Sequence, residues 1–88
     1  GSDCEIEEFY VTENIDALNN FKNKKNKSFD LLKLGGAQLL ATKVSGKLLG
    51  NPTNKINISP GMILIYLGSK DQLDSTRDKL SQILKNNS

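Results

Sequence analysis

Few side chains in this sequence could carry out chemistry. None of the 88 residues is histidine, so the most common general base and the most common metal ligand are both missing. The one cysteine, Cys4, lies near a terminus with no imidazole to activate its thiol. Glu5, Glu7, Glu8 and Asp30 are the upstream candidates for a carboxylate-based enzyme, and no phosphate-binding glycine loop or Cys/His cluster accompanies them. We therefore predict that the protein is not an enzyme and that the glutamates keep an exposed strand edge soluble.

Two further groups of residues could bind phosphate. Lys22, Lys24, Lys25 and Lys27 could contact a phosphate or a lipid headgroup, but no arginine or stacking aromatic lies between them. A solvated loop is the better interpretation of this cluster. Gly35-Gly36 could cradle a phosphate, but no long helix follows to add its N-terminal dipole. We interpret the glycine pair as a structural turn.

Composition narrows the class of protein. A net charge of +2 is too small to predict a polyanionic partner, so we expect no nucleic acid. No apolar stretch approaches the roughly 20 residues that span a bilayer, and a single cysteine suits a reducing compartment. We expect a cytoplasmic domain over residues 5–85, with a cloning scar and linker at 1–4 and a tail at 86–88. Such a small domain buries only about 60–65% of its unfolded surface, so its core is thin.

Four segments have the composition of strands. Glu5–Val11 combines β-branched and aromatic residues, and Gln38–Val44 is predicted as a second strand. A tight turn at Ser45-Gly46 should return Lys47–Leu49 antiparallel to it. Met62–Leu67 is continuously apolar between Pro60-Gly61 and Gly68, which predicts a central strand.

The clearest helix runs from Ser69 to Lys85. Ser69 and Gln72 form a capping box, and Asp74 can pair with Arg77 three residues later. The apolar stripe of this helix consists of Leu73, Thr76, Leu80, Ile83 and Leu84. Upstream, a short helix near Ile15–Phe21, a loop over 19–26 and one helical turn from Ser28 are also expected.

The predicted order is strand, loop with a short helix, hairpin, strand and long helix. This order indicates an α+β fold: a small, mainly antiparallel sheet with the C-terminal helix packed on one face. The other face of the sheet has no cover in this chain. We therefore expect a second copy to cover it, in a homodimer.

The residues from Glu5 to Leu84 resemble the TrkA-C domain, the C-terminal lobe of RCK-type regulators of potassium conductance. The matching segments are Gly36–Ala41, Ser45–Lys47, Asn51-Pro52, Gly61 before the strand Met62–Leu67, and the helix entry Gly68–Leu73. The sequence departs from the family at Asn26, where a glycine is usual. It also lacks an acidic residue near Lys55 and has Met62 where an aspartate is usual, so no cation site is expected there.

The resemblance implies a non-catalytic, ligand-sensing and dimerising regulatory domain. Domains of this family lie in the cytoplasm of prokaryotes, covalently attached to an RCK N-terminal lobe and a membrane pore. They control monoatomic cation transport by potassium channels, by Trk/Ktr transport subunits or by cation/proton antiporters. Some bind a small regulator between two copies, of which cyclic di-AMP is one example.

This hypothesis assigns five residues to the cleft between two protomers. They are Leu40, Thr42, Leu48, Asn51 and Pro52. Asn51 offers a donor and an acceptor, and it is expected to be extended because it precedes proline. The alternative is that Asn51-Pro52 is merely a turn.

A different class of function is an RNA-binding module similar to the S4 motif. Val44–Lys47 followed by Ile58–Ile63 resembles the short glycine hairpin and the following strand of that motif. Against it, Arg77 is the only arginine and lies on the last helix, and four clustered lysines do not follow a nucleic-acid backbone. The regulatory domain is therefore the preferred interpretation.

Overall fold

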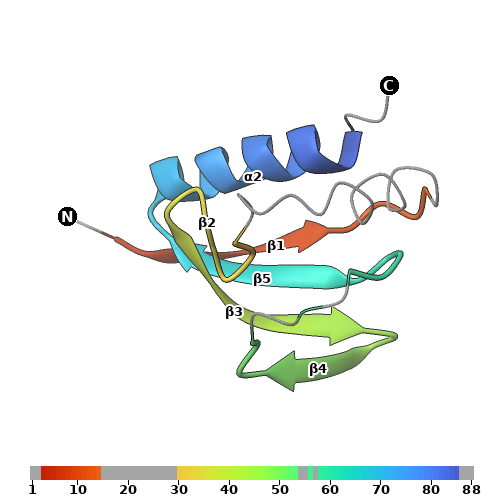
Figure 1. Cartoon of the computed structure of the whole chain (residues 1–88). Coiled ribbons are helices and arrows are strands. Elements are labelled where there is room, and N and C mark those ends of the chain that lie inside the picture. The colour runs from red at the N-terminus through yellow and green to blue at the C-terminus, as the bar shows by residue number, and fades with distance from the viewer. Residues whose placement is uncertain (1–2, 15–29, 54–55, 57, 86–88) are drawn as a thin grey trace.

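A computed structural model of the chain describes residues 3–14, 30–53, 56 and 58–85. These residues form a small α+β domain (Figure 1). Its elements are β1 (Glu5–Tyr10), β2 (Lys33–Leu34), β3 (Ala37–Val44), β4 (Lys47–Gly50), β5 (Ile63–Gly68) and helix α2 (Lys70–Lys85). The four strands predicted to begin at Glu5, Gln38, Lys47 and Met62 are all confirmed. Their observed ends differ from the predicted ends by at most one residue. The two-residue strand β2 was not predicted.

The sheet is antiparallel throughout, in the order β1-β5-β3-β2, and β4 also pairs with β3. β5 has strands on both sides, which confirms the prediction that the apolar run Met62–Leu67 is central. Its hydrogen-bonding edges are both occupied, so this run of apolar residues is removed from solvent better than an edge strand would be.

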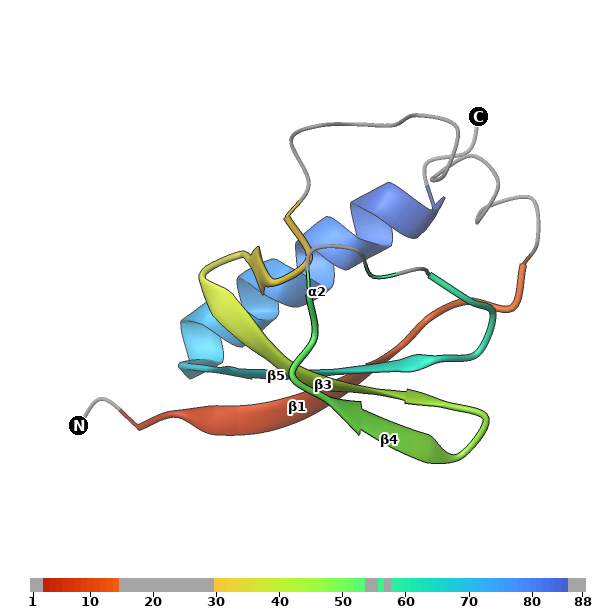
Figure 2. The same cartoon turned by 60° about the horizontal axis from the view of Figure 1, so that its bottom comes forward.

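Helix α2 covers one face of the sheet. In Figure 1 it runs along one side of the strands, and it contacts β1, β2, β3 and β5 but not β4. The turned view in Figure 2 shows α2 on one side of the sheet and no described segment on the opposite side. We call these two sides the covered face and the open face.

The core lies on the covered face. Leu64 and Tyr66 of β5 are fully buried there, and Leu73 of α2 packs against the same cluster. The ring of Phe9 meets that of Tyr66 edge-on at 5.7 Å between centroids. The Tyr66 hydroxyl donates to the carbonyl of Leu31 at 2.6 Å, so the one polar atom of this large side chain is satisfied inside the core. Burial raises the pKa of Tyr66, and the nearby Asp30 carboxylate adds to the shift.

Local signals explain where α2 begins. The backbone N–H of Ser69 donates to Gln72 Oε1 at 2.9 Å, and the N–H of Gln72 donates to Ser69 Oγ at 3.2 Å. The predicted capping box is therefore confirmed. Leu73, Thr76 and Leu80 of the predicted stripe are buried. The side chains of Ile83 and Leu84 lie outside the described part of the chain.

Two glycine turns set the strand register. Ser45 and Gly46 have φ values of 52° and 78°, and two positive values define the hairpin turn that matches the twist of the strands. Gly35, with φ of 67°, stands where an added Cβ would lie 2.6 Å from the backbone nitrogen of Thr76. The predicted turn at Gly35-Gly36 is thus confirmed, and it lets β2 and β3 approach α2 closely.

One backbone prediction was wrong. Asn51 was expected to be extended, but its φ is 51°. The chain must turn after β4, and asparagine adopts the left-handed conformation more readily than most residues. Several predictions fall outside the described residues. These are the short helix at 15–21, the loop over 19–26 with its lysines, the departures from the TrkA-C pattern at Asn26 and Lys55, and the start of the helical turn at Ser28. Leu32 N–H donates to Asp30 Oδ1 in the turn that follows.

Candidate functional site

The open face presents an ordered array of side chains. Directly opposed residues of antiparallel strands point to the same side of a sheet, so the register defines three rows across the strands. Tyr10, Ile63, Lys43 and Leu48 form the first row, Glu8, Ile65, Ala41 and Gly50 the second, and Ile6, Leu67, Gln38 and Lys33 the third. Seven of these twelve positions carry apolar side chains, so the face is mostly apolar.

Several of these apolar side chains are in contact with water. Ile6 is 63% exposed, Tyr10 is 71% exposed and Leu48 is 60% exposed. With strands about 4.8 Å apart and alternate residues about 6.8 Å apart, the array covers about 400 Å². An array of this extent is comparable to the largest apolar patch on a typical monomer, and such patches are often functional.

Two charges of opposite sign flank β5 in the open face, and Lys33 of β2 adds a third at the end of the third row. Glu8 lies on β1 beside Ile65, and Lys43 lies on β3 beside Ile63. Within the described residues, neither side chain forms an ion pair or a hydrogen bond. Each charge is thus available to a partner that covers the face.

The two outer edges of the sheet differ. Pairing of β1 with another β1 in antiparallel register would place glutamates opposite or next to glutamates, because three of its six residues are Glu5, Glu7 and Glu8. All four residues of β4 are exposed, and its edge carries Leu48 and Leu49. The charges of β1 therefore protect that edge, as predicted for these glutamates, while β4 is less protected.

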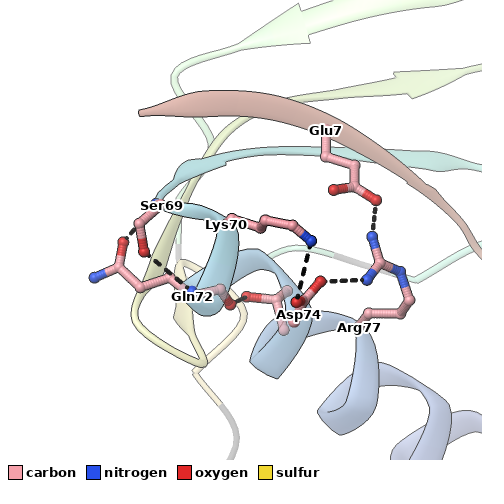
Figure 3. A network of polar contacts seen from close by, with 7 residues as sticks. Glu7, Ser69, Lys70, Gln72, Asp74 and Arg77 are labelled. Atoms are coloured by element: carbon pink, nitrogen blue, oxygen red, sulfur yellow. Dashed lines mark hydrogen bonds and ion pairs between the residues drawn. The ribbon is translucent and has the colours of Figure 1, made fainter. Parts of the chain in front are cut away.

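A polar network ties α2 to β1 on the covered side (Figure 3). Arg77 forms ion pairs with Glu7 and with Asp74. The pair with Asp74, in which Nη1 lies 2.8 Å from Oδ1, was predicted from the sequence. The Arg77 guanidinium also lies 5.5 Å from the centre of the Phe9 ring. The hydrogen bond with Glu7, followed by that with Asp74, raises the pKa of Arg77. Lys70 lies 4.0 Å from Asp74. These charges pair with one another, and the network holds the helix on the sheet.

The Glu7–Arg77 pair was not predicted from the sequence, because its members are 70 residues apart. A signal was present, since Glu7 and Phe9 alternate on one strand and must share a face. The same alternation groups Ile6, Glu8 and Tyr10 on the other face. The open-face residues of β1 could therefore have been found from the sequence.

The five residues assigned to a cleft do not share one surface. Thr42 is buried on the covered face, where it opposes Leu64 and Leu49, whereas Leu48 opposes Lys43 on the open face. Leu40 is half-buried at the register shift between Leu39 and Ala41. Asn51 is exposed and Pro52 is half-buried just beyond β4. Leu48 is the member of the group that the register places in the open face.

Within the described residues there is no group of three or more acidic, histidine or cysteine side chains that could hold a metal ion. Glu5 and Glu7 point to one side of β1 and Glu8 to the other, as their alternation predicted. Cys4 is exposed. No helix in the part of the chain that the structure describes is long and apolar enough to cross a membrane.

Comparisons with known proteins return no match. The chain matches no protein-family model, no curated protein and no solved structure.

Proposed function

We propose that this chain is a regulatory domain that acts as a homodimer and controls monoatomic cation transport by a potassium channel or a potassium-transport protein. The single observation that carries this proposal is the open face, an apolar array on the side of the sheet that α2 does not cover. The element order and the resemblance to TrkA-C domains support the same function. In this proposal the domain is cytoplasmic and is joined to an RCK N-terminal lobe and a pore in a prokaryotic protein.

The physical basis of such control is differential stability. Two arrangements of a dimer that differ in the area buried at the open face differ in free energy. The attached pore responds to whichever arrangement is favoured. A small regulator, such as cyclic di-AMP, shifts gating only by the difference in its affinity for the two arrangements. A modest interface suits this role, because an array of about 400 Å² lies below the roughly 800 Å² per partner of a standard stable interface.

Self-association is tested by light scattering of the 88-residue chain over a concentration series. A dimer whose population rises between micromolar and millimolar concentration is expected. Cyclic di-AMP can be titrated into the same samples, and a change in the dimer fraction would reveal a regulator that binds one arrangement. A chain that stays monomeric throughout would refute the dimer and with it the proposed function.

Transport is tested in the intact protein by potassium flux into proteoliposomes. Ile6→Asp places a charge in the open face at a side chain that is already 63% exposed, so the core is left intact. The matched control is Leu49→Asp, which makes the same chemical change at an exposed residue of the opposite parity. Regulated flux should be altered by the first variant and retained by the second. Equal behaviour of both variants would contradict control through this face.

A further inference from the structure

We propose that two copies pack open face to open face around a two-fold axis that passes over β5, between Ile63 and Ile65, with Glu8 of each copy opposite Lys43 of the other. This inference rests on the homodimer of the proposed function. It adds the surface, the register and the contacts that join the copies.

The positions of the two charges determine the axis. Glu8 lies one strand from Ile65 on one side of β5, and Lys43 lies one strand from Ile63 on the other side. The midpoint between Glu8 and Lys43 therefore coincides with the midpoint between Ile63 and Ile65. From the strand spacing, the backbone positions of Glu8 and Lys43 are about 12 Å apart, which is too far for a direct pair within one copy. An axis through this midpoint, in the plane of the interface and perpendicular to the line joining the charges, places each Glu8 opposite the second copy's Lys43.

The same axis, fixed by Glu8 and Lys43 alone, also pairs the exposed apolar side chains. From the strand spacing, Leu48 comes within about 3 Å of the second copy's Ile6 in projection onto the interface. Tyr10 lies next to the axis and within about 4 Å of the second copy's Tyr10 in the same projection. The three strongly exposed apolar residues of the open face thus all acquire partners.

Large and small residues are complementary in this arrangement. Leu67 is placed over the second copy's Gly50, and an added Cβ at Gly50 would meet no atom within 4 Å. The space left by the glycine can accept the leucine side chain. The strands of the two sheets cross at about 70°, near the orthogonal class of sheet packing.

Other modes of self-association account for fewer observations. Pairing through the outer edge of β1 brings glutamates together, and pairing through β4 leaves Ile6 and Tyr10 in water. Packing of the open faces covers these side chains and neutralises Glu8 and Lys43. The second copy is therefore the occupant that the pattern of charge and size fits.

The experiment is a charge exchange measured by sedimentation equilibrium on the whole chain. Glu8→Lys and Lys43→Glu each place like charges opposite one another twice per dimer, and each should weaken dimerisation about ten-fold or more. The double variant restores opposite charges at both places and should dimerise within about three-fold of the original chain. Restoration in the double variant excludes misfolding as the reason for the two losses.

Matched controls lie on the same strands. Glu5→Lys and Lys47→Glu make the same changes of charge at exposed residues whose side chains have the covered-face parity. Both should leave the dimer unchanged. Gly50→Val is predicted to weaken dimerisation without unfolding the chain, because it fills the space that Leu67 of the second copy occupies.

The outcomes separate this inference from the proposed function. Loss in both single variants and recovery in the double variant support the face-to-face dimer. A dimer that is insensitive to these charges, or that the double variant does not restore, overturns this arrangement but leaves the homodimeric regulatory domain in place. A chain that is monomeric at every concentration overturns both.

Discussion

Gly35 is the position where the fold depends most directly on the absence of a side chain. A Cβ at residue 35 would lie 2.6 Å from the backbone nitrogen of Thr76 and 2.9 Å from its Cα. Both atoms belong to the backbone of α2, so the contact cannot be relieved by rotating a side chain. Gly35→Ala therefore requires that α2 and the β2–β3 turn move apart.

The loss of stability can be worked out against Gly46→Ala. Gly46 has a similar positive φ, 78° against 67°, but an added Cβ would meet nothing within 4 Å. Alanine in the left-handed conformation costs about 1–2 kcal/mol, and the lower entropy of the unfolded chain offsets about 0.4–1 kcal/mol of this. Gly46→Ala should therefore lower the free energy of unfolding by about 1 kcal/mol.

Gly35→Ala carries the same conformational cost and two further ones. Overpacking against the helix backbone adds about 1–3 kcal/mol. Moving the helix away also weakens the hydrogen bond from Thr76 Oγ1 to the Leu34 carbonyl, now 2.5 Å long, at a cost of about 1 kcal/mol. The total is about 3–5 kcal/mol, which is a large part of the roughly 4–13 kcal/mol expected for a domain of 88 residues.

Urea unfolding followed by circular dichroism measures both variants. The midpoint should fall slightly for Gly46→Ala and by several times as much for Gly35→Ala. If Gly35→Ala is unfolded even without urea, the loss of stability at Gly35 is again larger than the loss at Gly46, as expected. Equal midpoints for the two variants would refute the close approach of α2 to the β2–β3 turn.

Two further predictions concern buried and capping groups. Because the pKa of Tyr66 is raised in the folded state, only the unfolded chain releases this proton above pH of about 10, so stability should fall as the pH rises beyond that value. In the Tyr10→Phe variant Tyr66 is the sole tyrosine, so tyrosinate absorbance should appear only as the protein unfolds. If this absorbance rises while the circular dichroism stays native, the burial of Tyr66 is contradicted. Ser69→Ala removes one half of the capping box and should cost about 1 kcal/mol in urea unfolding, whereas Ser81→Ala, inside the helix, should change little. Equal effects at Ser69 and Ser81 would argue against the cap.

Local patterns in the sequence predicted most of the elements. The capping box of Ser69 and Gln72, the hairpin turn at Ser45-Gly46 and the apolar run Met62–Leu67 each act over a few residues, so their residue types are sufficient evidence. β2 was missed because two residues carry no periodicity. It forms because the turn at Gly35-Gly36 brings Lys33 and Leu34 into antiparallel pairing with Gln38 and Ala37 of β3.

The candidate site was predicted less well. A two-residue turn pairs Val44 with Lys47, which places Leu48 opposite Lys43 and Thr42 opposite Leu49. Counting along this register would have separated Thr42 from Leu48 without any structure. The register shift at Leu40, in contrast, depends on how β3 fits between β5 and its other neighbours, and no local signal marks it.

Residue types and their spacing are sufficient to identify which segments are strands, where α2 begins and that β5 lies in the middle of the sheet. They do not determine which face of the sheet the helix covers. Both alternating sets of β5 are apolar, with Leu64 and Tyr66 on one side and Ile63, Ile65 and Leu67 on the other, so hydrophobicity favours neither side. Long-range contacts decided it: Gly35 admits the backbone of α2, Tyr66 reaches the Leu31 carbonyl and Glu7 pairs with Arg77, and all three lie on the same face. The set that α2 leaves uncovered is the surface to which the proposed function is assigned.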